Sequence, residues 1–128
     1  MRLNEQQFGA LLKRKSANPK AAMQALGRMP KGRMNKTETL YAQHLEARKH
    51  AGEIQGYWFE GMKFRLADAT FYTPDFMVLL ANGELQAHEI KGFWTDDARV
   101  KIKVAAATHP VAFVAIQRKS GEWAYEWF

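Results

Sequence analysis

Three charged residues near the middle of the chain have the types and spacing needed for metal-assisted chemistry. Thirteen residues separate Asp75 from Glu89, and Lys91 follows two positions later. Because side chains alternate between the faces of a strand, Glu89 and Lys91 are expected on one face of a strand over 84–91. The pair Asn82-Gly83 predicts a hairpin. That hairpin would bring Asp75, on the preceding strand, beside the other two.

This combination of side chains favours a particular chemistry. Two carboxylates and an ammonium at the edge of an apolar sheet are costly to bury without a compensating charge. Asp75 and Glu89 are therefore expected to hold Mg²⁺, which prefers oxygen ligands and keeps several waters, with Mn²⁺ as a substitute. The metal would polarise a phosphoryl oxygen and lower the pKa of a bound water. Lys91 would stabilise negative charge at phosphorus or orient the attacking water. The alternative is a structural ion cluster.

Glu38 is a further candidate for the same site. A helix is predicted over 36–51, and Glu38 shares one face of it with Tyr41 and Leu45. This placement is expected to point its carboxylate inward. Glu38 also lies three residues after Asn35, where a capping-box glutamate would stand without any role in catalysis.

The elements that position these residues follow from the spacing of apolar and turn-forming residues. The pattern predicts a helix over 36–51, strands over 57–66, 70–80 and 84–91, a helix over 95–107 capped by Thr95, a strand over 111–117 and a closing strand over 123–128. This order is typical of an α/β fold with a mixed central sheet. The aromatic residues within 58–64 and 123–127 are expected to pack in the core or in an interface.

Positive charge is concentrated at the start of the chain. Residues 1–36 hold nine Lys or Arg and one Glu, whereas 37–128 hold ten Lys or Arg and twelve Asp or Glu. We therefore expect a basic, helical N-terminal extension over 1–33 and a separate domain over 34–128. The extension is either a nucleic-acid contact or a solvated arm. The residues expected to contact nucleic acid are Lys13, Arg14, Lys15, Lys31, Arg33, Lys36, Arg99, Lys101 and Lys103.

Three of these cations lie on the helix predicted over 95–107. Arg99 and Lys103 are one turn apart and are expected to face outward. Lys101 is expected on the sheet side, where its amine either reaches a phosphate or extends to solvent. Phe93 and Trp94, just before this helix, either stack on a base or pack against the protein.

The composition argues against several other classes of site. The chain has no cysteine, which excludes disulfides and thiolate zinc sites. Its four histidines have no metal-ligand spacing, and we find no glycine-rich phosphate loop and no Ser or Cys nucleophile arrangement. No apolar run approaches the roughly 18–20 residues that cross a bilayer, and the first residues lack a secretion signal. We expect a cytoplasmic protein without membrane contact or a small-molecule substrate.

The sequence Pro74-Asp75, followed by Glu89-Ile90-Lys91, resembles the active-site motif of the PD-(D/E)xK nucleases. The resemblance covers most of the chain but not the basic extension. It implies an αβββαβ core like that of restriction endonucleases, and Mg²⁺-dependent cleavage that leaves a 5′-phosphate and a 3′-hydroxyl. In that superfamily the main-chain carbonyl between the Glu and the Lys also contacts metal, which corresponds to Ile90.

The chain also resembles a family of small phage and prophage proteins. The shared stretches are Met34-Asn35-Lys36-Thr37-Glu38, Tyr72-Thr73-Pro74-Asp75 and Glu89-Ile90-Lys91-Gly92. Holliday-junction resolvases of the nuclease superfamily carry an acidic residue on the first core helix, and Glu38 matches it. These resemblances imply a phage-encoded endonuclease that acts in the host cell on Holliday junctions or branched DNA. A resolvase needs two active sites, hence a homodimer. A nicking or restriction-type endonuclease and an inactive DNA-binding protein are the alternatives.

Overall fold

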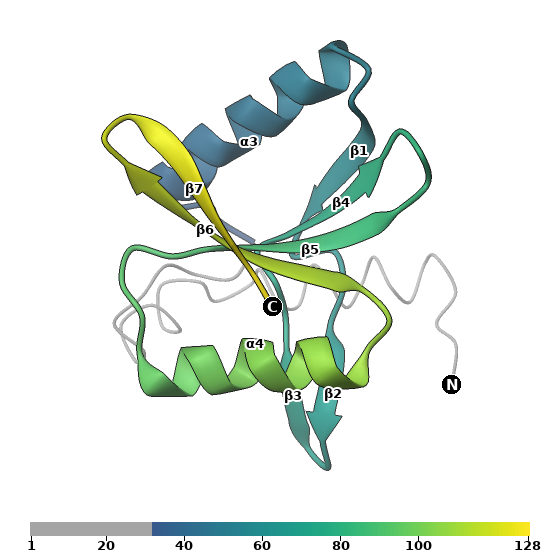
Figure 1. The fold of residues 1–128 in the computed structure, drawn as a ribbon, viewed down its shortest axis with the longest axis vertical. Coiled ribbons are helices and arrows are strands. Elements are labelled where there is room, and N and C mark those ends of the chain that lie inside the picture. The colour runs from purple at the N-terminus through teal and green to yellow at the C-terminus, as the bar shows by residue number, and fades with distance from the viewer. Residues whose placement is uncertain (1–31) are drawn as a thin grey trace. The chain divides into compact units, whose positions relative to one another are not determined.

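A mixed five-stranded sheet forms the centre of the domain. The computed structural model describes residues 32–128, of which Lys36–Phe128 forms one compact unit. In chain order the elements are α3 (Lys36–His50), β1 (Ile54–Phe59), β2 (Phe64–Ala67), β3 (Thr70–Tyr72), β4 (Phe76–Leu80), β5 (Leu85–Ile90), α4 (Asp96–Thr108), β6 (Ala112–Lys119) and β7 (Glu122–Trp127). The main sheet has the strand order β1-β4-β5-β6-β7, and β2 pairs with β3 in a second small sheet (Figure 1).

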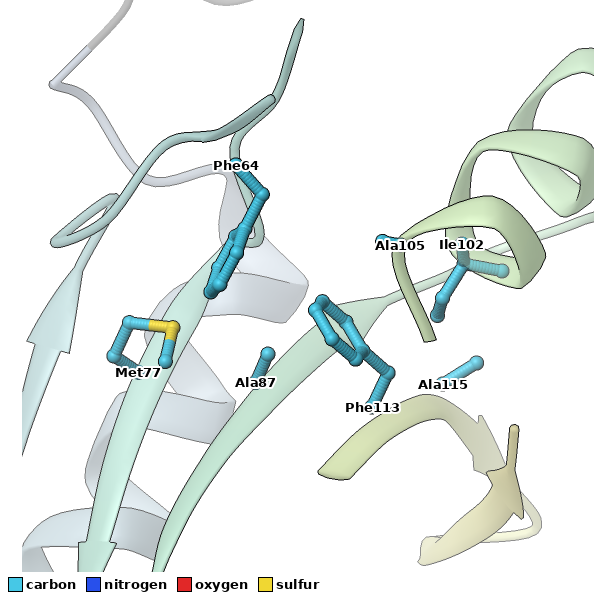
Figure 2. Packing of buried hydrophobic residues seen from close by; sticks show 7 residues of the cluster. All are labelled: Phe64, Met77, Ala87, Ile102, Ala105, Phe113 and Ala115. Carbon is cyan, nitrogen blue, oxygen red and sulfur yellow. The ribbon is translucent and has the colours of Figure 1, made fainter. Parts of the chain in front are cut away.

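The two helices cover opposite faces of the main sheet (Figure 1). Helix α3 buries Glu38, Tyr41 and Leu45, and the Tyr41 ring lies against Phe76. Helix α4 packs on the other face through Ile102 and Ala105. The buried apolar cluster under α4 contains Phe64, Met77, Ala87, Ile102, Ala105, Phe113 and Ala115 (Figure 2).

Strand alternation places the candidate acidic residues on the α4 side of the sheet. Met77 and Ala87 are paired across β4 and β5 and both belong to the α4 cluster. Asp75 lies two residues before Met77, and Glu89 lies two residues after Ala87. Since side chains alternate along each strand, both carboxylates face the same side as that cluster.

The connection from β5 to β6 explains why these two strands run parallel. Thr95 caps α4, because its hydroxyl accepts a hydrogen bond from the Ala98 N–H at 3.2 Å. Asp96 and Asp97 lie in the first turn, where the positive end of the helix dipole favours acidic side chains. The helix carries the chain back along the sheet, so β6 pairs with β5 in the same direction, while the other main-sheet pairs are antiparallel. The predicted cap and helix are confirmed.

Two long strands were predicted over 57–66 and 70–80, and both predictions are wrong. The chain leaves β1 at Glu60, which has a positive φ of 50° and donates its N–H to the Asp75 carbonyl at 2.8 Å. Pro74 has no N–H to donate and separates β3 from β4. The consequence is a β2–β3 hairpin inserted between two neighbouring strands of the main sheet.

The α/β class and the mixed central sheet are confirmed. Apart from the β2–β3 insertion, the elements follow the predicted order of helix, three strands, helix, strand and closing strand. The Asn82-Gly83 turn joins β4 and β5, with φ 91° at Gly83 and a 2.9 Å hydrogen bond from the Glu84 N–H to Asn82 Oδ1. The helices predicted within residues 1–31 lie outside the described part of the chain. Neither α3 nor α4 is long and apolar enough to cross a membrane.

Candidate active site

Asp75 and Glu89 are held together by reciprocal contacts between side chain and main chain. The Asp75 N–H donates to Glu89 Oε1 at 3.2 Å, and the Ile90 N–H donates to Asp75 Oδ2 at 2.8 Å. One oxygen of Glu89 is therefore fixed by the backbone before β4, and one oxygen of Asp75 is fixed by the backbone of β5. The Asp75 carbonyl is in turn bonded to the Glu60 N–H, which ties the segment before β4 to the end of β1.

Lys91 completes a compact group of charges at the end of β5. Its Nζ lies 3.8 Å from Glu89 Oε2, and its main-chain N–H donates to the Ile116 carbonyl of β6 at 2.8 Å. The amine also lies 5.7 Å from the centre of the Trp94 ring. The predicted neighbourhood of Asp75, Glu89 and Lys91 is thus present, and the backbone of three strands fixes it.

Glu38 also reaches this group. It is buried in the first turn of α3, with Tyr41 and Leu45 further along the same face, as predicted. Its side chain forms a hydrogen bond with Asp75 that helps to lower the pKa of that residue. Helix α3 lies on one face of the sheet, and Asp75 and Glu89, which we call the acidic pair, lie on the opposite face. The helix therefore contributes a carboxyl group to the acidic pair.

Burial makes the acidic pair reluctant to carry two negative charges. Burial and, to a lesser degree, the negative charge of Glu89 raise the pKa of Asp75 to about 8, against the opposing hydrogen bonds from Ile90 and Glu38. Burial also raises the pKa of Glu89, although the ammonium of Lys91 opposes this. At neutral pH the metal-free pair consequently retains a proton, and a bound cation would favour its release.

The chemistry of these donors fits a hard divalent cation. Among residues 32–128 there is no ready cluster of three or more His, Asp or Glu side chains that could hold a metal. Mg²⁺ does not require such a cluster, because one or two carboxylates with waters and substrate oxygens complete its coordination. The second oxygens of Asp75 and Glu89, and the carbonyl of Ile90 between Glu89 and Lys91, are the groups that could supply the protein ligands.

Tyr72 is a residue of this site to which the sequence assigned no role. Its hydroxyl is buried without a well-formed hydrogen bond, the one such buried side-chain atom in the described part of the chain. Burial raises the pKa of Tyr72, and the charges of Glu89 and Asp75 raise it further. Conversely, the hydroxyl helps to lower the pKa of Glu89. The only available signal was a polar aromatic residue three positions before Asp75.

The cations predicted to contact nucleic acid are placed differently. Arg33, Lys36, Lys101 and Lys103 are exposed, whereas Lys13, Arg14, Lys15 and Lys31 lie outside the described residues. The exposure of Lys101 agrees with the alternative that its amine extends to solvent, whereas Ile102 and Ala105 form the buried face of α4.

Arg99 lies at the surface of α4, as predicted, but it has an acidic partner within the domain. Its guanidinium forms two hydrogen bonds with the Glu126 carboxylate, at 2.8 and 3.3 Å. It also lies 4.4 Å from the centre of the Trp94 ring. Its charge is therefore already paired within the domain.

The neighbours of the acidic pair divide into packed and exposed residues. His88 faces the α3 layer as predicted, away from Glu89, and bonds to Tyr41. Trp94 packs against Phe128 with ring centres 5.7 Å apart. Phe93 has no such packing and is 78% exposed, two positions after Lys91. An aromatic side chain thus projects into solvent close in sequence to the charged group.

The chain matches no protein-family model, no curated protein and no solved structure.

Proposed function

We propose that this protein is a Mg²⁺-dependent DNA endonuclease of the PD-(D/E)xK type with an αβββαβ core. The observation that carries the proposal is the reciprocal hydrogen bonding of Asp75 and Glu89, with Lys91 Nζ 3.8 Å from Glu89. A structural ion pair would not need a second buried carboxylate beside the first, because that carboxylate raises the cost of burial.

Each residue has a distinct role in the proposed reaction. Asp75, Glu89 and the Ile90 carbonyl would hold the metal. When bound, Mg²⁺ supplies Lewis-acid polarisation of the phosphodiester and makes the attacking water more acidic. Lys91 orients that water or stabilises the charge that develops on a phosphate oxygen. Glu38 holds Asp75 from the α3 side through their hydrogen bond.

Tyr72 adds a positioning role to this scheme. Its hydroxyl is buried near Glu89 and makes no well-formed hydrogen bond. If Glu89 holds a cation, this hydroxyl would be placed to donate to the Glu89 carboxylate and so satisfy its own buried donor. Tyr72 would then fix the rotamer of a metal ligand without contacting the substrate.

The proposed substrate is branched DNA, with a homodimer supplying two active sites. Exposed Lys101 and Lys103 lie on α4, which covers the sheet face that carries the acidic pair. Contacts of this kind with phosphates position DNA without reading its sequence. Exposed Phe93 offers a surface for an unpaired base, which a branch point exposes. A nicking or restriction-type enzyme would use the same chemistry on a different DNA.

The experiment that tests the function is a cleavage assay on linear duplex, single-stranded, flapped, nicked and four-way DNA. Each substrate is incubated with Mg²⁺, with Mn²⁺, with Ca²⁺ and with EDTA. We expect cleavage in Mg²⁺ and Mn²⁺ only, fastest on the branched substrates, with 5′-phosphate ends. Tight DNA binding without cleavage in any metal would instead indicate an inactive DNA-binding protein.

A further inference from the structure

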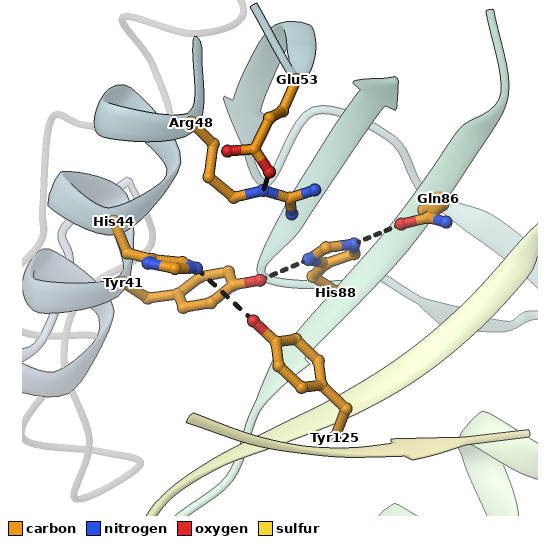
Figure 3. A network of polar contacts seen from close by, with 7 residues as sticks. All are labelled: Tyr41, His44, Arg48, Glu53, Gln86, His88 and Tyr125. Atoms are coloured by element: carbon orange, nitrogen blue, oxygen red, sulfur yellow. Dashed lines mark hydrogen bonds and ion pairs between the residues drawn. The ribbon is translucent and has the colours of Figure 1, made fainter. Parts of the chain in front are cut away.

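A polar network lies on the sheet face opposite the acidic pair (Figure 3). The Tyr41 hydroxyl and His88 Nδ1 are 2.7 Å apart, and His88 Nε2 is 2.9 Å from Gln86 Oε1. Because the Gln86 oxygen can only accept, His88 Nε2 carries the proton and Nδ1 accepts from Tyr41. Both ring nitrogens of the buried histidine are therefore used inside the protein.

Gln86 also carries an amide donor that this network does not use. Gln86 is 9% exposed, and its oxygen is bonded to His88. Its amide nitrogen has no hydrogen-bond partner among residues 32–128, and Figure 3 shows it turned away from His88. Tyr72 Oη is the one fully buried side-chain atom without a partner in the described part of the chain, so the Gln86 nitrogen keeps some exposure, and there it can donate to a ligand or a water.

This amide lies in the wall of a cavity between α3 and β7. The cavity has a volume of about 470 Å³, and its lining includes His44, Arg48, Glu53, Gln86, Tyr125 and Trp127. This volume is in the range of sites for small organic ligands. Arg48 lines the cavity, and its Nε lies 3.5 Å from Glu53 Oε1, so its guanidinium is a further donor group at the cavity.

The charges of the cavity favour a neutral ligand over a phosphate. Burial lowers the pKa of His88 to about 3, and it also lowers the pKa of His44, with Arg48 adding to both effects. The two imidazoles are consequently uncharged at neutral pH. The positive charge of Arg48 is balanced by Glu53 beside it. The polar groups therefore offer several donors and one carboxylate acceptor, with no net charge.

Two aromatic side chains border this cavity at the edge of the sheet. Tyr125 is 43% exposed and Trp127 is 56% exposed, so of the two expected positions, core or interface, the core is wrong for these residues. The Tyr125 hydroxyl lies 3.4 Å from His44 Nε2, which connects β7 to α3 across the cavity (Figure 3). A flat ligand could stack on these rings while its edge meets Gln86, Arg48 and Glu53.

We propose that this cavity binds a nucleobase with a carbonyl group, guanine in preference to adenine. Guanine carries a carbonyl acceptor beside N–H donors on one edge, which complements the donors of Gln86 and Arg48 and the Glu53 acceptor. Adenine has no carbonyl for these donors. The base comes either from a free nucleotide or from an unpaired position in a nucleic-acid strand. This site is separate from the acidic pair and does not depend on nuclease activity.

The test is a binding measurement on the full chain in EDTA, so that no cleavage can occur. GMP, AMP and ribose 5-phosphate are titrated by calorimetry. A short single strand with a fluorescent guanine analogue is titrated by the emission of that base. Trp127→Ala removes the stacking surface, and Trp58→Ala is the matched control, because Trp58 is similarly exposed (50%) on β1 at the other edge of the sheet. Both substitutions change exposed side chains, and circular dichroism confirms that the variants fold.

We expect GMP to bind roughly tenfold more tightly than AMP, and Trp127→Ala to weaken GMP binding by about tenfold. Ribose 5-phosphate should not bind, and Trp58→Ala should bind like the parent protein. Quenching of the base analogue in the strand would identify a strand as the source, and GMP binding without quenching would identify a free nucleotide. No binding of GMP, equal binding of AMP or ribose 5-phosphate, or equal losses in the two tryptophan variants would overturn the proposal.

Discussion

The main-chain N–H of Asp75 donates to the Glu89 carboxylate at 3.2 Å, although the two residues lie fourteen positions apart in the chain. The Ile90 N–H donates in return to the Asp75 carboxylate at 2.8 Å. Backbone hydrogen bonds therefore fix the positions of both carboxylates of the acidic pair. The position of each carboxylate thus depends on strand register more than on side-chain packing. Substitutions that remove only the charge of a carboxylate should leave these backbone hydrogen bonds in place.

Asp75→Asn and Glu89→Gln should each abolish cleavage while preserving the fold and DNA binding. Each keeps the shape of the side chain and an oxygen that can accept the backbone hydrogen bond, but loses the charge that holds metal. The matched control is Asp68→Asn, which changes an exposed carboxylate in the β2–β3 turn. Single-turnover cleavage in Mg²⁺ and DNA binding in Ca²⁺ are measured for all three. Full cleavage by both acidic-pair variants would refute the assignment.

Local patterns predicted part of this site correctly. Period-two alternation is a property of any strand, so it was enough to place Glu89 and Lys91 on one side and His88 on the other. The Asn82-Gly83 turn set the pairing of β4 with β5, and with it the approach of Asp75. These features depend on residues that are close together in the sequence, so they can be predicted from one sequence alone.

Other features depended on contacts between distant residues. Pro74 interrupts the segment predicted as one strand, but where β3 goes afterwards depends on its pairing with β2. The unsatisfied Tyr72 hydroxyl is visible only once its burial is known. Arg99 was expected to be free for nucleic acid, yet its partner Glu126 comes from β7, 27 residues later. No spacing rule links those positions.

The stability of the metal-free protein should fall as pH rises from about 6.5 to 8. The pKa of Asp75 is raised from 3.8 to about 8 in the folded chain, so the folded state holds a proton that the unfolded chain has released. Stability is then lost as pH rises toward the folded value. Below pH 6.5 the lowered pKa of His88 has the opposite effect, because it makes stability increase as pH rises. The range from pH 6.5 to 8 is therefore the one that reports on Asp75.

Thermal unfolding in EDTA across this window measures the effect. We expect a fall in Tm of several degrees, since about 1 kcal/mol corresponds to roughly 4–8 °C for a domain of this size. Asp75→Asn should flatten the dependence, and Mg²⁺ should restore stability at pH 8. A parent protein with the same slope as Asp75→Asn would show that Asp75 is already ionised at neutral pH.

Tyr72→Phe should weaken metal binding while leaving the fold intact. The substitution removes a buried hydroxyl that makes no well-formed hydrogen bond in the metal-free protein, so its stability should change little or rise. In the metal-loaded protein the hydroxyl is expected to hold Glu89, and its loss should raise the half-saturating Mg²⁺ concentration several-fold. Tyr57→Phe is the control, because that hydroxyl bonds to Glu46 at 2.7 Å, away from the acidic pair. Equal metal titrations for parent and Tyr72→Phe would remove Tyr72 from the site.

The basic N-terminal extension should contribute DNA affinity that depends on salt. Residues 1–36 carry nine of the nineteen Lys and Arg residues of the chain. Removing residues 1–30 should weaken duplex binding and flatten its dependence on salt, since each lost phosphate contact lowers the log–log slope by about 0.9. Binding isotherms at several salt concentrations measure this slope. An unchanged slope would mean that the extension does not contact DNA.

Lys91 should act on the chemical step more than on binding. Its Nζ lies 3.8 Å from Glu89 and is partly exposed, so it can meet charge on a single phosphate oxygen. Lys91→Ala should slow single-turnover cleavage by about 10²–10³, the usual effect of losing one preorganised charge stabiliser. Lys91→Arg should restore little, because the planar guanidinium is wider than the ammonium.

The control for this prediction is Lys101→Ala, which removes an exposed amine on α4. It should weaken DNA binding slightly and leave the saturated rate unchanged, whereas Lys91→Ala should show the reverse pattern. The decisive pair of measurements is the cleavage rate at saturating enzyme in Mg²⁺ and the binding isotherm in Ca²⁺. If Lys91→Ala cleaves at the parent rate once saturated, the amine beside Glu89 serves only to bind DNA. The proposed mechanism would then be wrong in its central step.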